Sequence, residues 1–252
     1  MSSKWSLPKN DPWSTPFAES LLHLLEIRKG DQILDIASGG GIPAFYLADQ
    51  VGIEGTVLAV DIHQSQILRS RTIQGTELPW LRFEVGDMRF LPADLPMFDR
   101  ITGNLSFMFF RPNRFEALQN LVRFLKPGGQ IVLTFPSLGT FDSLWNQVDK
   151  EMVALSLKDE RKALDEYINE RPSALQAETW LQELGLEKVA VIEQPLEIPT
   201  GSGRSFLEHP LLRGGFLDDI YECFQDQDQA NEFMNDLSQK VSTFTPLFAL
   251  RC

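Results

Sequence analysis

Hydrophobic residues in the first half of the chain alternate between short continuous runs and stretches with helical spacing. Near the N-terminus, an apolar stripe with helical spacing predicts a helix over residues 15–28, and its members are Phe17, Leu21, Leu22, Leu25 and Ile27. Five apolar runs then predict strands at 32–37, 56–62, 81–87, 98–104 and 130–136. Between them, helical patterns cover 43–51, 64–74 and 115–125.

This alternation of strand and helix predicts the fold class. The five runs are nearly all apolar rather than alternating, which is typical of strands that are buried on both faces. Strands that take turns with helices build βαβ units, whose strands lie parallel in one sheet. We therefore expect an α/β fold with a mainly parallel sheet and helices on both of its faces.

The pattern changes after Pro136. One or two amphipathic helices are expected over 143–172 and another over 174–185, while 186–194 resembles a sixth strand. Residues from 195 onward are irregular until an extended pattern returns near the end. With no visible repeat or linker, we expect one domain over residues 1–252, with its parts distributed as a cofactor-binding core at about 20–136, cap segments at about 137–172 and 195–241, and a final strand at about 243–251.

Composition narrows the classes of partner. The formal net charge is −12, so the surface repels phosphate backbones and we expect no nucleic-acid partner. No apolar run approaches the roughly 20 residues that span a bilayer, and no secretory signal is visible at the start. The two cysteines show no metal-ligand or redox spacing, so we expect a cytoplasmic protein without a metal site. The partner that we expect is a small molecule.

The stretch "ILDIASGGGIPAFYLA" at 33–48 carries the strongest indication of chemistry. Gly39, Gly40 and Gly41 join a strand to a helix, where a bare backbone lets a ligand approach the carboxyl end of the sheet. Asp61 ends the second strand 20 residues after Gly41, at the spacing expected for an acid that binds the ribose of an adenosine. The alternatives are a tight turn and a helix-capping aspartate.

Two adenosine cofactors fit this loop. "GGGIPA" matches G-x-G-x-x-A, which favours a nicotinamide dinucleotide. Asp35 lies just before the loop, where its carboxylate would repel a pyrophosphate but would attract a cation. S-adenosylmethionine carries both an amino group and a sulfonium, so Asp35 favours this cofactor, with S-adenosylhomocysteine as the product.

"DIASGGG" resembles the first motif of class I S-adenosylmethionine-dependent methyltransferases, D/E-x-G-x-G-x-G, with Ala37 in place of the first glycine. The resemblance continues through "AVDIH", "EVGDMRFLP", "FDRITGNLSF" and "LKPGG", in the order and spacing of the small-molecule type that is similar to the ubiquinone C-methyltransferase group. It implies a Rossmann-like, doubly wound, mostly parallel sheet of seven strands with an antiparallel last strand, and helical or loop cap insertions.

The resemblance also implies roles for individual residues. Asp35 and the backbone of Ala37, Gly39 and Gly41 would hold the methionine part of the cofactor. Asp61 would bind the ribose and Ile62 would lie against the adenine. The other implied contacts are Asp87 and Met88 at the adenine, and Asn104 and Leu105 toward the amino-acid part and the methyl acceptor.

The expected reaction is methyl transfer to a small, apolar or aromatic acceptor. Aromatic residues gather near the predicted cap and would form either an acceptor pocket or ordinary core, namely Phe107, Phe109, Phe110, Phe141, Trp145, Phe206 and Phe216. His209 and Asn104 are the candidates for a catalytic group, and neither has a defined role. Two alternatives stay open: an NAD(P)-dependent oxidoreductase that uses the same glycine turn, and a non-catalytic scaffold that binds the cofactor.

Overall fold

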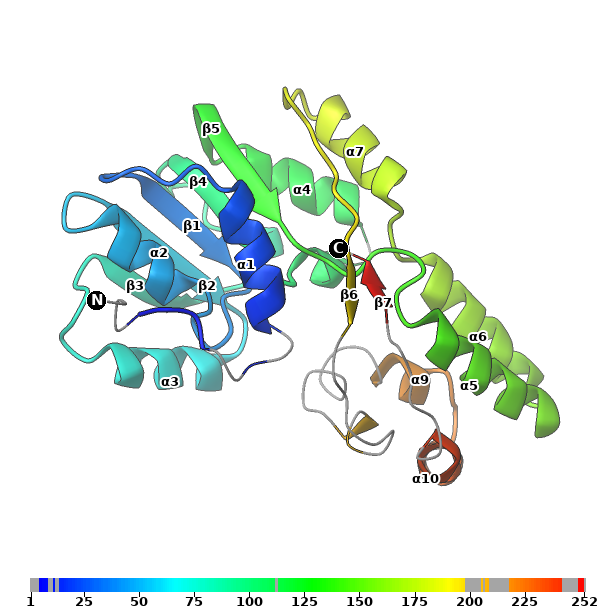
Figure 1. Cartoon of the computed structure of the whole chain (residues 1–252). Coiled ribbons are helices and arrows are strands. Elements are labelled where there is room, and N and C mark those ends of the chain that lie inside the picture. Colours follow the sequence, from blue (N-terminus) through cyan, green and yellow to red (C-terminus); the bar gives the residue numbers. More distant parts are fainter. Residues whose placement is uncertain are drawn as a thin grey trace. The chain divides into compact units, whose positions relative to one another are not determined.

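The structure is a computed structural model, and the residues that it describes are 5–8, 11, 14–111, 113–197, 205, 207–208, 218–241 and 249–251. Contacts divide the chain into two compact units. The first unit comprises Met1–Phe135 and Thr179–Val189, and the second comprises Pro136–Glu178 and Ala190–Cys252. Each unit is described by itself below (Figure 1).

The first unit contains a parallel sheet of five strands. They are β1 (Gln32–Ile36), β2 (Thr56–Asp61), β3 (Leu81–Val85), β4 (Phe98–Gly103) and β5 (Leu125–Leu133). Their order in the sheet is β3-β2-β1-β4-β5, and every pair of neighbours is parallel. All five strands predicted from the sequence are therefore present, each with its ends within a few residues of the prediction except for β5, which begins earlier.

Helices connect these strands and cover the sheet. They are α1 (Ser14–Leu24), α2 (Ala44–Val51), α3 (Gln64–Gln74), α4 (Arg114–Val122) and two short 3₁₀ turns, η1 (Met88–Phe90) and η2 (Phe107–Phe109). The chain moves outward from β1 to β3 and then returns to the other side of β1 with β4. Because β-α-β crossovers are right-handed, this reversal puts α2 and α3 on one face and α4 on the other. The sheet is doubly wound, as predicted.

Burial of apolar residues holds α1, α2 and α3 on one face of the sheet (Figure 1). One cluster joins Leu21 of α1 and Leu47 of α2 to Ile33 and Val57 of the two central strands, and all four are almost completely buried. Alternate residues of a strand share a face, so Asp35 lies on the same side of β1 as Ile33. The buried carboxylate of the predicted site therefore belongs to the side that these helices cover.

The second unit is mainly helical in its described part. Its long helices are α5 (Asp142–Ala154), α6 (Lys158–Asn169) and α10 (Gln227–Val241), with the short α9 (Asp218–Glu222) before the last of them. Helix α7 (Ala174–Glu183) contains residues of both units. Strands β6 (Pro195–Glu197) and β7 (Ala249–Arg251) form a separate, antiparallel pair.

The prediction of a seven-stranded sheet is wrong for the described residues. The stretch 186–194 forms no strand, and β7 pairs in antiparallel orientation with β6 instead of joining the parallel sheet. Lys188 adopts a left-handed conformation with φ 55°, which interrupts an extended run, and no residue from 186 to 194 is buried. Without a buried face, this stretch lacks the hydrophobic gain that would add it to the sheet.

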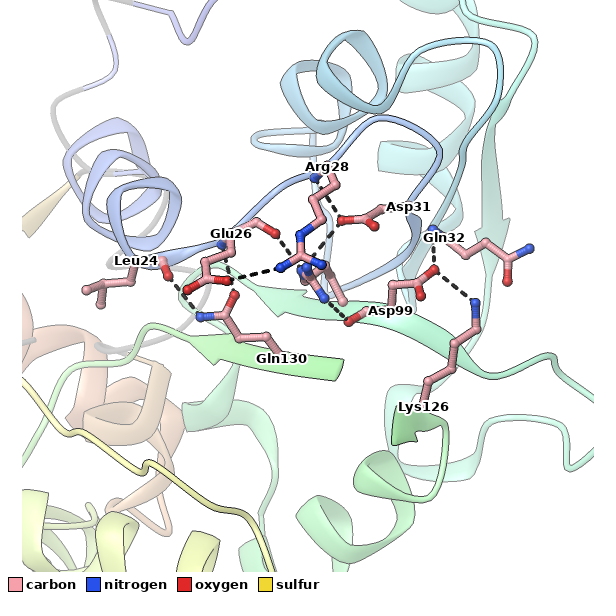
Figure 2. Close-up of polar contacts among 9 residues, drawn as sticks. Leu24, Glu26, Arg28, Asp31, Gln32, Asp99, Lys126 and Gln130 are labelled. Atoms are coloured by element: carbon pink, nitrogen blue, oxygen red, sulfur yellow. Dashed lines mark hydrogen bonds and ion pairs between the residues drawn. The ribbon is translucent and has the colours of Figure 1, made fainter. Parts of the chain in front are cut away.

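Polar contacts join the amino-terminal edge of the sheet to the segment after α1 (Figure 2). The buried Arg100 of β4 donates from Nε to the Glu26 carbonyl at 2.6 Å, and this nitrogen lies 3.5 Å from Asp31 Oδ2. Asp99 Oδ2 accepts from the backbone N–H of Gln32 and from Lys126 Nζ, each at 2.9 Å. Side chains of β4 and β5 therefore fix the start of β1.

We expect Arg100→Met to destabilise the fold by about 3 kcal/mol, because it leaves Asp31 buried without its cationic partner. The matched control is Arg28→Met, since Arg28 pairs with Glu26 at 3.7 Å while both side chains are about three-quarters exposed. That change should cost less than about 1 kcal/mol. Urea denaturation measures both values, and equal losses would contradict the importance of the buried pair.

Candidate functional site

The strand order reverses between β1 and β4, and ligands of open α/β sheets bind at the carboxyl ends of strands at such a point. Asp35 of β1 and Thr102 of β4 are register partners there, and both are fully buried. The Thr102 hydroxyl donates to Asp35 Oδ1 at 2.8 Å. Among the described residues, no group hydrogen-bonds to Asp35 Oδ2, although that oxygen is buried.

Burial dominates the protonation of Asp35. Loss of hydration raises its pKa from an ordinary 3.8 to about 7; the bond from Thr102 opposes this rise and the neighbouring Asp61 adds to it. A carboxylate with a free oxygen and a pKa near neutrality is costly to keep in a protein interior. Such a group is suited to a ligand that brings a positive charge and a hydrogen-bond donor.

The loop after β1 adopts the backbone conformations that its glycines allow. Gly39 and Gly41 have φ values of 50° and 87°, in the left-handed region. A Cβ on Gly41 would come within 2.6 Å of the Phe45 ring, whereas one on Gly39 would meet nothing within 4 Å. The glycine at 41 is required for packing against α2, and the one at 39 leaves its surroundings open. Ala37 also has a positive φ, 48°.

Asp61, predicted to bind a ribose, is bound to the glycine loop and to His63, the residue that precedes α3. Its Oδ2 accepts from the Gly39 N–H at 2.8 Å, and its Oδ1 accepts from the His63 N–H at 2.8 Å and lies 3.1 Å from His63 Nδ1. The N-cap residue of α3 is His63, which makes no side-chain capping bond, so Asp61 does not fill the helix-capping role that the sequence left open. Because a carboxylate has about four lone-pair sites, further donors can still bind Oδ2.

Exposed apolar side chains lie beside Asp61. Ile62 follows Asp61 directly and is 57% exposed. Val85, the register partner of Asp61 on β3, is 52% exposed. The 3₁₀ turn after β3 adds Phe90, which is 76% exposed. Water-exposed apolar groups at the carboxyl ends of neighbouring strands can lie against a flat, apolar ring, and the contact of Ile62 with an adenine stays a prediction.

Asp87, predicted at the adenine, forms an ion pair with Arg89. The Arg89 guanidinium contacts both carboxylate oxygens, with Nη2 2.6 Å from Oδ2 and Nε 3.0 Å from Oδ1. These bonds hold the pKa of Asp87 below its ordinary value. Asp87 also accepts from the backbone N–H of Arg89 and so caps the turn in which Met88 lies half-buried. The sequence pattern did not single out Arg89.

Asn104, predicted to face the amino-acid part and the acceptor, bonds at both ends of its amide. Its Nδ2 donates to the Ser14 carbonyl at the start of α1 at 3.0 Å, and its Oδ1 accepts from Thr134 Oγ1 at 2.9 Å. Thr134 Oγ1 in turn accepts from the N–H of Leu105 at 2.9 Å. Asn104 therefore joins α1 to the ends of β4 and β5, while the catalytic role considered for it stays a prediction.

The aromatic residues expected in an acceptor pocket include buried core residues. Phe107 and Phe110 are buried in the first unit, where Phe107 contacts the rings of Phe110 and Phe135. Phe141 and Trp145 are buried in the second unit. These four rings support the interpretation as ordinary core. The side chains of Phe109, Phe206 and Phe216 lie outside the described residues, as does His209.

The described part of the chain lacks two further features. No helix in it is both long enough and apolar enough to cross a membrane. It also contains no group of three or more histidine, cysteine, aspartate or glutamate side chains placed to hold a metal ion.

Thr102 is a residue of this candidate site that the sequence did not reveal. It is a polar residue in a strand whose neighbours Ile101 and Gly103 are buried, and a hydroxyl in such a run needs a partner. That requirement is the available signal, but the partner, Asp35, lies 67 residues away in the chain. Only the pairing of β1 with β4 brings the two side chains together.

The strand order, the glycine loop and the buried Asp35 are typical of α/β domains that bind a ligand at the carboxyl ends of their strands. Comparisons with known proteins show what the chain is similar to. Residues 33–129 match the family model of a methyltransferase domain. The chain is 25% identical over 187 residues to the demethylmenaquinone methyltransferase of Shouchella clausii, covering 73% of each protein. It is 33% identical over 114 residues to a ubiquinone/menaquinone biosynthesis C-methyltransferase of Idiomarina loihiensis, covering 42% of this chain and 43% of that enzyme.

Among solved structures, an S-adenosylmethionine-dependent methyltransferase from Aquifex aeolicus matches with a TM-score of 0.52 and 18% identity, over 73% of this chain and 93% of that one. At this identity the likeness shows the fold alone. Over residues 33–129 these matches agree with the predicted resemblance to class I S-adenosylmethionine-dependent methyltransferases. The chain spans about half the length of several curated relatives that it matches.

The buried Asp35 predicts a pH-dependent stability. Between about pH 4 and pH 7 the unfolded chain ionises this carboxyl while the folded protein keeps it protonated, so the stability of the ligand-free protein falls as the pH rises. Asp35→Asn removes this loss. We expect its stability relative to the unmodified protein to increase over that range by on the order of 4 kcal/mol. Urea denaturation at a series of pH values measures the difference, and a constant difference would contradict the raised pKa.

The backbone conformation of Ala37 predicts that a glycine at this position stabilises the protein, whereas glycine inside a helix or strand destabilises it. Its φ of 48° is unfavourable for a residue with a Cβ, so Ala37→Gly should stabilise the protein by about 0.5–1 kcal/mol. Ala163→Gly is the matched control, because Ala163 lies inside α6 and glycine there should cost about 1 kcal/mol. Thermal melts compare the two variants. A loss at both positions would show that Ala37 is not strained.

Proposed function

We propose that this chain transfers the methyl group of S-adenosylmethionine to a small, apolar or aromatic acceptor. The observation that carries the proposal is Asp35, a buried carboxylate with one oxygen unpartnered among the described residues, at the point where the strand order reverses. It suits the cationic amino group of this cofactor and would repel a diphosphate. The family match of residues 33–129 supports the same choice over a nicotinamide-dependent reductase.

The predicted contacts are proposed with the following roles. Asp35 and the backbone of Ala37, Gly39 and Gly41 hold the methionine part of the cofactor. Asp61 binds the ribose with the lone pairs that Gly39 and His63 leave available. The remaining contacts are Ile62, Asp87 and Met88 at the adenine, with Asn104 and Leu105 at the amino-acid side.

The protein's share of the reaction is positioning. When bound, the cofactor supplies an electrophilic methyl group on a sulfonium, so an aligned acceptor needs no further activation of the donor. The loop and Asp35 fix the cofactor in orientation, which removes rotational freedom before the reaction. A base is needed only for an acceptor that must lose a proton, and His209 and Asn104 stay the candidates for that role.

The acceptor class rests on the relatives. Two of them carry names that refer to menaquinone or ubiquinone biosynthesis, which motivates a flat, apolar acceptor for this chain. A more distant relative is a tRNA methyltransferase of Thermus thermophilus, 32% identical over 125 residues. The net charge of −12 is unfavourable for binding RNA, so a small molecule is the proposed acceptor. The cytoplasmic location and the division into a single domain with cap segments also stay predictions.

Calorimetry with the full chain tests the proposal. We expect it to bind S-adenosylmethionine and S-adenosylhomocysteine and not NAD, because the first two bring a cationic amino group to Asp35 whereas NAD brings a pyrophosphate to the glycine loop. Transfer of a tritiated methyl group to menaquinone precursors or to a cell extract then separates an enzyme from a scaffold. Binding of NAD alone would contradict the cofactor assignment, and binding without transfer to any acceptor would favour the scaffold.

Asp61→Ala should weaken binding of S-adenosylhomocysteine by on the order of 1.5–3 kcal/mol, because a charge-assisted bond to the ribose is lost. The control is Asp99→Ala, since Asp99 is a partly buried, paired carboxylate at the opposite edge of the sheet. Asp99→Ala should lower stability and leave the affinity intact. Calorimetry and thermal melts of both variants decide, and equal affinities for Asp61→Ala and the unmodified chain would show that the ribose lies elsewhere.

A further inference from the structure

Strand β4 presents two polar side chains to the face of the sheet that α1, α2 and α3 cover. Each of them contacts an acidic residue of the segment that contains β1. Arg100 and Thr102 alternate along the strand and so share this face, and they contact Asp31 and Asp35 respectively. Arg100 neutralises a charge at the amino-terminal edge. Thr102 cannot do so, because a hydroxyl carries no charge.

Burying the hydroxyl of Thr102 costs free energy that a residue needed only for packing would avoid. Valine has nearly the same shape and, unlike threonine, brings no hydroxyl that must find a partner in a buried position. Thr102 is fully buried, and its hydroxyl donates to Asp35 Oδ1 at 2.8 Å. The bond therefore links the two residues for a reason other than packing.

The bond orients the carboxylate. A carboxyl group rotates broadly about its last side-chain torsion, and a donor on one oxygen fixes that rotation. With Oδ1 held by Thr102 on the β4 side, Oδ2 is kept as the oxygen that accepts from a ligand, and it is the one without a hydrogen-bond partner among the described residues. Donation from a hydroxyl also favours the ionised carboxylate over the protonated form.

We propose that Thr102 is a positioning residue, which holds Asp35 so that Oδ2 receives the cationic amino group of the bound cofactor. This inference rests on the proposed function, because it takes the ligand to be S-adenosylmethionine or its product. Thr102 touches no part of the ligand and acts through Asp35. Its effect is therefore confined to ligands that carry the amino group.

Two ligands whose sulfur is an uncharged thioether separate this role from a merely structural one. S-adenosylhomocysteine carries the amino-acid part, and 5′-methylthioadenosine has the same nucleoside without it. We expect Thr102→Val to weaken S-adenosylhomocysteine by about tenfold, the loss typical of one hydrogen bond to a charged group, and to leave 5′-methylthioadenosine unchanged. Thr102→Ser keeps the hydroxyl and should restore affinity close to that of the unmodified chain. Calorimetry gives each affinity.

A double-mutant cycle supplies the second readout. In the Asp35→Asn background the cationic contact is already lost, so adding Thr102→Val should weaken S-adenosylhomocysteine no further. Thermal melts show whether each variant folds, and Thr102→Ala replaces Thr102→Val if the valine variant does not.

Three results would overturn the proposal. These are an unchanged affinity of Thr102→Val for S-adenosylhomocysteine, an equal loss for both thioethers, and a full additional loss in the Asp35→Asn background. Each would leave the proposed function intact as long as the unmodified chain binds S-adenosylhomocysteine. Failure of the unmodified chain to bind it would overturn the proposed function and this proposal together.

Discussion

A buried acid with an incomplete set of hydrogen bonds is the constraint on which the site depends. Asp35 lies at the reversal of the strand order, under the helices that cover one face, where water cannot hydrate it. An isolated protein gains nothing from a carboxyl in this position, because burial penalises its charged form. A cationic ligand changes that balance, since it brings the missing donor and the compensating charge. The cost to the fold is thereby coupled to ligand binding.

The acidic residues at the two edges of the sheet differ in their hydrogen-bond and ion-pair partners. At the amino-terminal edge, Asp31 and Asp99 are bound by Arg100, Lys126 and backbone N–H groups, and this edge is a fixed support (Figure 2). At the carboxyl edge, Asp35 accepts a hydrogen bond from the Thr102 hydroxyl on Oδ1, and no group in the described part of the chain bonds to its Oδ2. Rigid anchoring at one edge holds the strands in place, so that the other edge can keep hydrogen-bonding capacity for a ligand.

The sequence predicted what depends on local patterns. Periodicity located the five parallel strands. The glycine run with Asp61 at its spacing predicts where a nucleoside binds. The expected strand at 186–194 failed because alternation alone does not show whether a strand has a face to bury. Asn104 and Thr102 have partners 90 and 67 residues away, respectively, which no local pattern reveals. Asp87 lies two residues beyond the end of β3, where it caps the 3₁₀ turn, and its pairing with Arg89 depends on the geometry of that turn.

The contact between Asp61 and Gly39 makes the glycine loop and the nucleoside end of the site interdependent. Asp61 holds the Gly39 N–H at 2.8 Å, and Gly39 is one of the positions with a left-handed backbone. A ribose that binds Asp61 therefore draws on the same carboxylate that shapes the loop for the methionine part. Because the loop and Asp35 are adjacent in the chain, binding of the proposed cofactor at one end would stabilise the arrangement needed at the other. The two halves of the cofactor are thus expected to bind as one cooperative event rather than as independent contacts.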